Sequence, residues 1–309
     1  MSSDLAAAAR SLRHAGLDAV REFVSRTYYS LGSRSDPDDV LAADWDLLVV
    51  LDACRADVFA DVVGDGDYSF GVGGTATSPA STSTEWLETV FGDASDDDLA
   101  DISYVTGNPY SSRTVDTDRL GACEEVWRSA WDDDLGTIPP RPLTDAAIRA
   151  GRRDDGTDRL VVHYMQPHFP TVFGADGEPG GSDDGIALDD WGDEPMSVWE
   201  QLRFGQRSVD DVWADYERNL EAVLADVEVL LSNVDAETAV LTADHGNAFG
   251  EHHIYGHPGG VDLPALREVP WCETTASDDH TRDPGDPGGE RATDEETVDD
   301  RLESLGYKV

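Results

Sequence analysis

The sequence predicts an α/β fold in which a mostly parallel central sheet is covered by helices on both faces. Three short apolar runs, at residues 46–51, 159–164 and 238–243, have the pattern of buried strands, and helical patterns separate them. Each run ends in groups that can bind a metal or move a proton: Asp52, His163 and the pair Asp244-His245. Because the carboxyl ends of parallel strands meet at one edge of a sheet, we expect a functional site there.

The other elements follow from periodicity and turn residues. We expect helices at 4–31, 55–63, 85–91, in pieces over 115–152 and at about 209–232, and strands at 68–72 and 102–105. Residues 173–195, rich in Gly, Asp and Pro, are predicted to form a loop or lid. We divide the chain into a helical extension (1–40), a main domain (41–273), a flexible acidic segment (274–297) and a C-terminal helix (298–309) that returns to the main domain.

Composition limits the possible partners and location. The chain has 309 residues, a net charge of −43 and one lysine, Lys308, which is typical of a halophilic protein. So acidic a chain repels nucleic acid and anionic membranes. We predict a cytoplasmic protein without a membrane span. The chain has three cysteines without a CxxC pair, no apolar run of about 18 residues and no secretory signal. No oligomeric state follows from the sequence.

Asp244-His245-Gly246 is the most specific metal-binding pattern. An Asp and a His that leave a buried strand together offer oxygen and nitrogen ligands, which suit Zn²⁺ or Mn²⁺. Asp52 is a second candidate ligand, although an Asp after a strand is often only a helix cap. His257 lies between Gly256 and Pro258, where a rigid backbone can aim its imidazole into a site. The alternative for Asp244 and His245 is a capping Asp and a His with satisfied hydrogen bonds.

The hydroxyl-rich loop 75–84 precedes the helix expected at 85–91. Most of its Ser and Thr residues must be caps or loop residues, but one of them can serve as a nucleophile. A metal lowers the pKa of a bound hydroxyl, and a helix N-terminus stabilises an incoming anion. Arg55 can clamp a phosphate or sulfate through two hydrogen bonds, or can simply form a surface ion pair.

These segments together resemble the alkaline phosphatase superfamily, in its sulfatase-like branch. The resemblance runs in order from about residue 44 to the C-terminus and rests on residues 50–57 (VLDACRAD), 163–168 (HYMQPH), 241–246 (LTADHG), 249–257, 267–271 (REVPW) and 301–307 (RLESLGY). It implies an alkaline phosphatase-like three-layer sandwich with a metal held by Asp52, Asp244, His245 and a nucleophilic hydroxyl. His168 and His257 would face the substrate or complete a second metal site.

The nucleophile is assigned by spacing within this resemblance. Phosphoglycerol transferase-like members place a Thr four residues before a Glu-aromatic pair, and counting back from Glu85-Trp86 gives Ser81. Thr77, two residues before Pro79, and Thr82 are the alternatives. The formylglycine pattern of sulfatases is missing, which favours phosphate over sulfate esters. Ala53 stands where many sulfatases have a second aspartate, which makes Ca²⁺ less expected than Mn²⁺ or Zn²⁺.

The resemblance predicts a metal-dependent hydrolase or transferase of phosphate or sulfate esters, acting on a small molecule or glycan through a covalent Ser or Thr intermediate. Arg55 and His168 would stabilise the transferring anion, and His168 or His257 would protonate the leaving oxygen. The alternative is a catalytically inactive sulfatase-like protein that serves as a binding or scaffold module.

Overall fold

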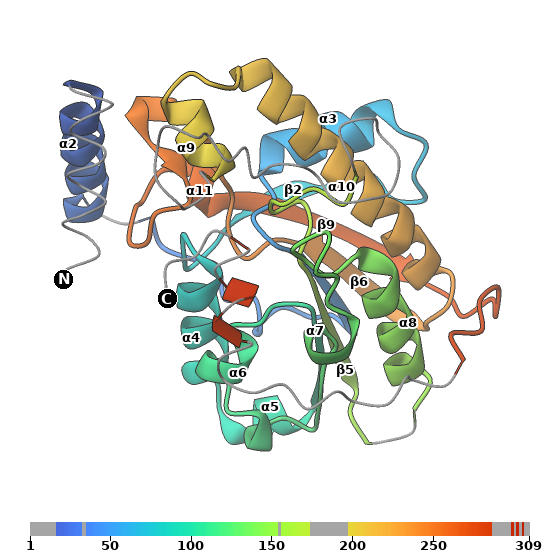
Figure 1. The fold of residues 1–309 in the computed structure, drawn as a ribbon. Helices are drawn as coiled ribbons and strands as arrows, with labels where there is room; N and C mark the ends of the chain where they lie inside the picture. Colours follow the sequence, from blue (N-terminus) through green and yellow to red (C-terminus); the bar gives the residue numbers. More distant parts are fainter. Residues whose placement is uncertain are drawn as a thin grey trace.

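The computed structural model describes residues 17–32, 35–153, 156–173, 197–285, 298, 299, 301, 302 and 305. A seven-stranded sheet with the order β2-β9-β6-β1-β5-β3-β4 runs through the described region (Figure 1). Its strands are β1 (Leu47–Leu51), β2 (Gly74–Thr77), β3 (Ile102–Thr106), β4 (Ala122–Glu125), β5 (Arg159–Tyr164), β6 (Ala236–Thr242) and β9 (Glu268–Ala276). A separate small hairpin pairs β7 (Ala248–Phe249) with β8 (Tyr255–Gly256).

The central strands are parallel, as the sequence predicts. β1 pairs with β5 on one side and β6 on the other, and β3 pairs with β5 and β4, all in parallel. Only β9 and β2, at one edge, run antiparallel to their neighbours. Since β1, β5 and β6 are adjacent, their carboxyl ends open at the same place on the sheet edge.

The alternation of side chains along β1 builds the two cores. Leu47, Val49 and Leu51 pack with buried residues of α3 (Ala56–Asp65), α8 (Pro140–Gly151) and α10 (Val209–Leu231). Leu48 and Val50 pack on the other face with α4 (Ser83–Gly92) and Leu99 of α5 (Asp96–Ala100). Successive residues of a strand point to opposite faces, so an unbroken apolar run predicts a sheet that is covered on both sides. The predicted three-layer α/β architecture is confirmed.

Capping residues place the ends of the long helices. Ser208 accepts a hydrogen bond from the Asp211 amide at the start of α10, and Thr82 accepts one from the Glu85 amide at the start of α4. The remaining helical segments are α2 (Leu17–Leu31), α6 (Ser111–Thr114), η1 (Thr117–Arg119), α7 (Trp127–Ala130), α9 (Val198–Arg203), η2 (Glu251–His253) and α11 (Pro264–Arg267). Among the described residues, no helix is long and apolar enough to cross a bilayer.

The strand predicted at 68–72 is wrong, because the chain enters the sheet only at Gly74. Gly73 has a φ of +70°, and a Cβ there would lie 2.6 Å from Cys272 Cα, so the turn before β2 requires glycine. Other strands were not predicted: β4 lies within the stretch predicted to be helical, and β9 extends to Ala276, inside the segment predicted to be flexible. The short strands β7 and β8 were not expected either.

Several predictions lie largely or partly outside the described residues. These are the start of the leading helix (4–16), most of the loop or lid (174–195), residues 286–297 of the acidic segment and most of the C-terminal helix. The division of the chain into domains stays a prediction.

Candidate active site

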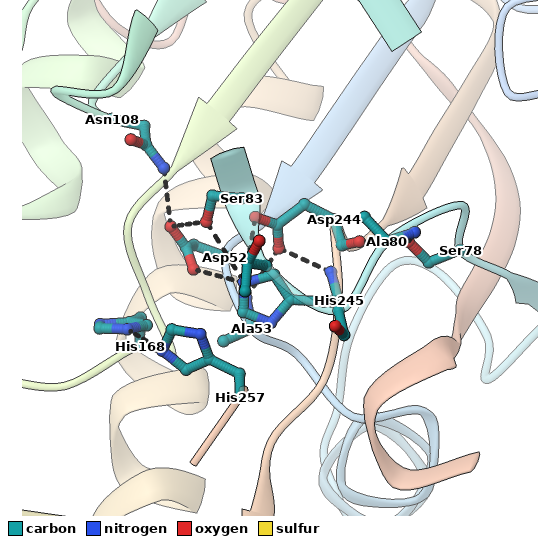
Figure 2. Close-up of polar contacts among 12 residues, drawn as sticks. Asp52, Ala53, Ser78, Ala80, Ser83, Asn108, His168, Asp244, His245 and His257 are labelled. Carbon is teal, nitrogen blue, oxygen red and sulfur yellow. Dashed lines mark hydrogen bonds and ion pairs between the residues drawn. The ribbon is translucent and has the colours of Figure 1, made fainter. Parts of the chain in front are cut away.

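Polar side chains from four segments converge where the parallel strands end (Figure 2). Asp52 directly follows β1, Asp244 and His245 follow β6, Asn108 follows β3, and Ser83 is the first residue of α4. All five side chains are fully buried. The structure therefore brings together the predicted residues Asp52, Asp244 and His245, which are far apart in the sequence.

Only one of the two carboxylate oxygens of Asp52 has hydrogen-bond partners in the described part of the chain. Its Oδ2 accepts hydrogen bonds from Asn108 Nδ2 at 3.0 Å and from Ser83 Oγ at 3.2 Å. Its backbone amide donates to Tyr164 O at 3.0 Å, which fixes the residue against the end of β5. The other oxygen, Oδ1, has no hydrogen-bond partner within the described part of the chain.

Asp244 repeats this arrangement. Its Oδ1 accepts backbone hydrogen bonds from Ala53 at 2.9 Å and from His245 at 2.8 Å, which fixes the carboxylate plane. Its Oδ2 lies 3.5 Å from His245 Nε2 and 3.7 Å from His163 Nε2, and it too has no hydrogen-bond partner among the residues described.

A metal ion fits the atoms that this arrangement leaves unpaired. Three buried atoms lack hydrogen-bond partners in the described region: Asp52 Oδ1, Asp244 Oδ2 and His163 Nε2. They belong to groups whose ligand atoms lie within 4.8 Å of one another. Buried polar atoms without partners are rare and destabilising, so three that converge call for a ligand. Two carboxylate oxygens with imidazole nitrogen are suitable donors for Zn²⁺ or Mn²⁺.

The two carboxylates affect each other's protonation. Burial, and next the nearby charge of Asp244, raise the pKa of Asp52 well above its usual value. Burial would also raise the pKa of Asp244, but His245, His163 and the Ala53 amide together lower it below its usual value. In the absence of a cation, a proton in this pair is therefore favoured on Asp52 rather than on Asp244.

His245 presents a lone pair to the cluster. Its Nδ1 lies 2.9 Å from Gly246 O, and because a carbonyl oxygen only accepts, Nδ1 carries the proton in the neutral ring. Nε2 is then the basic nitrogen, 3.2 Å from Ser83 Oγ and 3.8 Å from Asp52 Oδ1. A backbone acceptor that fixes the tautomer in this way is typical of metal-binding histidines.

Ser83, which the sequence analysis did not single out, is the hydroxyl beside Asp52 and His245. It lies at the N-terminus of a ten-residue helix, where backbone N–H groups and the helix dipole favour a negative charge. The predicted residue Ser81 lies outside the cluster: its Oγ donates to Pro258 O at 2.9 Å, and Glu85 Oε2 is 3.2 Å away.

The two alternative hydroxyls have other positions. Thr82 uses its Oγ1 as the N-cap of α4. Thr77 ends β2, where its amide donates to Asp38 Oδ2 at 2.7 Å.

His168 and His257 form the outer part of the site. Their Nε2 atoms lie 3.0 Å apart, and the His257 ring stacks on His245 with centroids 4.7 Å apart. His168 is buried, and its Nδ1–H donates to Phe169 O. Burial, and next the charge of His245, lower the pKa of His168 to about 4, and the same two causes, with the charge of His168, lower the pKa of His257. The structure thus brings both predicted histidines next to the cluster, as neutral rings.

Arg55 is engaged elsewhere. Its guanidinium pairs with Asp57 and Glu251, donates to Asn247 O at 3.0 Å and stacks over Trp213. This geometry fits the ion-pair alternative better than an anion clamp. A pocket of about 300 Å³ lies beside Arg55 and is lined by residues of 55–57, 251–252, 263–265 and 268. None of the buried side chains of the cluster lines it, so we do not assign it to the substrate.

Two features of the sequence point to Ser83, which was missed, and to His163, which was named only as a candidate group at the end of its strand. Thr82-x-x-Glu85 is a capping pattern, which makes Ser83 the first helical residue and places it at the helix N-terminus. The alternation along β5 turns His163 to the same face as Val161, toward α4, where Trp86 packs on its ring and Tyr104 Oη lies 3.0 Å from its Nδ1. Asn108 has no such signal, because its position depends on the turn after β3.

No protein-family model and no curated protein matches the sequence. Among solved structures, the integral membrane protein lipooligosaccharide phosphoethanolamine transferase A (EptA) from Neisseria meningitidis matches with a TM-score of 0.53 and 12% identity, over 84% of this chain and 54% of that one. The chain has an alkaline phosphatase-like fold. The fold predicted from the motifs is thereby confirmed, and the chain spans about half the length of that transferase.

Two further structures match with lower scores. The C-terminal periplasmic domain of phosphoethanolamine transferase EptC from Campylobacter jejuni has a TM-score of 0.48 and 16% identity, over 74% of this chain and 78% of that one. A 2-O GAG sulfatase has a TM-score of 0.45 and 11% identity, over 75% and 64%.

Proposed function

We propose that the protein is a metal-dependent transferase or hydrolase of phosphate or sulfate esters, with Ser83 as its nucleophile. The observation that carries this proposal is the convergence of three unpaired ligand atoms, on Asp52, Asp244 and His163, beside a hydroxyl at a helix N-terminus. The similarity in fold to phosphoethanolamine transferases and sulfatases supports the same class of reaction. Phosphate esters are preferred, because the chain lacks the formylglycine pattern of sulfatases.

Asp52, Asp244 and His245, with His163 as a fourth candidate, would hold a Zn²⁺ or Mn²⁺ ion. When bound, such an ion lowers the pKa of a neighbouring hydroxyl and offsets the negative charge of the transferring group. Asn108 and the backbone amides of Ala53 and His245 fix the two carboxylates, so the donor atoms are positioned before the ion binds.

The chain's own groups account for both transfer steps. Asp52 Oδ2 and His245 Nε2, each 3.2 Å from Ser83 Oγ, are the groups that can accept the hydroxyl proton. Ser83 Oγ then bonds to phosphorus as the bond from phosphorus to the leaving oxygen breaks. The neutral ring of His168 or His257 would pass on to that oxygen the proton that Ser83 gave up. Water or an acceptor alcohol next attacks phosphorus, Oγ leaves, and Ser83 is reprotonated.

The test compares Ser83→Ala with the matched variant Ser81→Ala. Turnover of an aryl phosphate with Zn²⁺ or Mn²⁺ should fall by about 10³-fold or more in Ser83→Ala and by less than about tenfold in Ser81→Ala. Trapping with a slow substrate followed by peptide mass spectrometry should place the covalent phosphate on Ser83. A phosphate on Ser81 or Thr82 would refute the assignment of the nucleophile, and full activity in both variants would refute a covalent Ser intermediate.

A further inference from the structure

Helix α2 exposes an apolar stripe to solvent. Five of the seven large apolar side chains that are exposed in the described region belong to this helix: Val20, Phe23, Val24, Tyr28 and Leu31. The most exposed are Phe23 and Tyr28, each at 71%, and Leu31, at 82%. Their spacing puts them on one face of the helix. An apolar hollow of about 410 Å³ runs along this stripe, which is defined here as Val20, Phe23, Val24, Thr27, Tyr28 and Leu31.

The opposite face of α2 fixes this orientation. Glu22 is buried, and its carboxylate pairs with Arg203 at 2.7 Å and with Arg26 at 2.5 Å. Tyr29 contacts His252 with ring centroids 5.2 Å apart, and its carbonyl accepts a hydrogen bond from Asp262 N at 3.2 Å. The helix thus turns its polar side to the protein and its apolar side outward, the reverse of an ordinary surface helix. Figure 1 shows α2 at one side of the molecule, away from the layers of the sheet.

The charge of this part of the chain also differs from the rest. Residues 1–34 contain five arginines and three acidic residues, a net charge of +2, whereas residues 35–309 contain 17 basic and 62 acidic residues, a net charge of −45. The repulsion from anionic membranes expected for the whole chain therefore does not apply to its N-terminal part. An exposed apolar stripe in a segment of positive charge is typical of helices that lie in a membrane interface.

We propose that α2 docks the protein on the surface of a lipid bilayer, with the stripe inserted among the acyl chains. A second copy of the chain fits less well, because the stripe offers six residues where a stable dimer buries about 20–30 on each side. A dimer would also bring together two bodies that each carry a charge of −45. Insertion into a bilayer requires neither a larger apolar surface on the protein nor a partner protein of complementary shape.

Contacts connect α2 to the segment that carries His257 of the candidate active site. Tyr29 holds the segment around His252 and Asp262, and His257, which lies between them in sequence, faces His168 and His245. The helix and one wall of the site therefore belong to the same packed unit. The proposal goes beyond the ester chemistry and does not rest on it, because it follows from α2 alone.

Flotation of the full chain with vesicles of phosphatidylcholine and phosphatidylglycerol tests the proposal. The double variant Phe23→Ser/Leu31→Ser should lower the partition coefficient of the protein between water and vesicles at least about tenfold. The reason is that each apolar side chain buried in the bilayer contributes roughly tenfold or more in affinity. The matched control Val72→Ser/Val209→Ser removes two exposed apolar side chains elsewhere and should float as the wild type does. Circular dichroism should show that both variants remain folded.

Two results would overturn the proposal. One is a wild-type protein that stays out of the vesicle fraction, or a stripe variant that floats equally well. The other is sedimentation velocity showing a lipid-free wild-type dimer and a monomeric stripe variant, which would make the stripe a contact between copies. Turnover of a soluble aryl phosphate, measured in parallel, should be the same in wild type and stripe variant, so that a failure of the ester chemistry is seen separately.

Discussion

Replacing Asp244 by asparagine should abolish the stabilisation by metal while leaving the metal-free protein folded. Asparagine keeps an oxygen that can accept the hydrogen bonds from the Ala53 and His245 amides. It removes the negative charge of Asp244 and places an amide N–H where Asp244 Oδ2 has no hydrogen-bond partner among the described residues. Because the pKa of Asp244 is lowered in the folded protein, its charge stabilises the fold, so the metal-free variant should lose some stability but remain folded.

The magnitude follows from the geometry and from binding linkage. Two full charges whose oxygens lie within 4.8 Å would repel by roughly 3–4 kcal/mol at an effective dielectric constant of about 20, which together with burial raises the pKa of Asp52. A metal at about 100 times its Kd stabilises the folded wild type by about 2.7 kcal/mol. For a domain of this size, that corresponds to a rise in Tm of roughly 5–10 °C.

The assay is thermal unfolding after treatment with a chelator and again after addition of Zn²⁺ or Mn²⁺. The wild type should show the rise in Tm, and Asp244→Asn should show almost none. If Asp244 served only as a hydrogen-bond acceptor, asparagine would replace it, and the variant would respond to metal as the wild type does. Equal metal-induced shifts in two folded proteins would refute the reasoning.

Three other predictions test the structure around the site. Arg55→Met should destabilise the protein by roughly 1–3 kcal/mol in urea denaturation, because Asp57 and Glu251 lose their partner, while kcat changes less than about tenfold; a large loss of kcat alone would restore the anion clamp. Gly73→Ala should lower the free energy of unfolding by roughly 1–3 kcal/mol, because the φ of Gly73 is +70° and a Cβ there would meet Cys272 Cα. The control is Gly71→Ala, where a Cβ meets nothing within 4 Å, and an equal loss of stability in the two variants would contradict this reason. Burial lowers the pKa of His168 to about 4 in the folded protein, so its contribution to stability is present above the unfolded pKa of about 6.5 and is lost as the pH falls toward about 4. His168→Gln should therefore flatten the dependence of the free energy of unfolding on pH between these two values. An unchanged slope would rule out this role.

The parallel sheet could be predicted because its strands are buried on both faces. Runs such as 47–51 are apolar at every position, and each is followed by a polar group that cannot remain in the strand. β9 is different: polar residues, Glu268 and 273–275, stand on both sides of the apolar stretch 269–272 in a partly exposed strand, and its pairing with β6 depends on tertiary contacts. Such a strand has no signal that distinguishes it from a loop.

The sequence indicates the candidate metal ligands that the structure brings together, but not the hydroxyl that lies beside them. Asp244 and His245 are adjacent, so their chemistry is visible in the sequence itself. The choice among the hydroxyls at 75–84 depends on where α4 begins, and an error of two residues separates Ser81 from Ser83. Arg55 had two possible roles because sequence spacing does not show which carboxylates approach it in space.

The most direct test of the account is a crystal structure of the protein grown with Zn²⁺ or Mn²⁺, with anomalous diffraction measured at the absorption edge of the metal. The account predicts one strong peak about 2.0–2.2 Å from Asp52 Oδ1, Asp244 Oδ2 and His245 Nε2, with Ser83 Oγ adjacent. Peaks confined to exposed carboxylates, with no metal between Asp52 and Asp244, would contradict it.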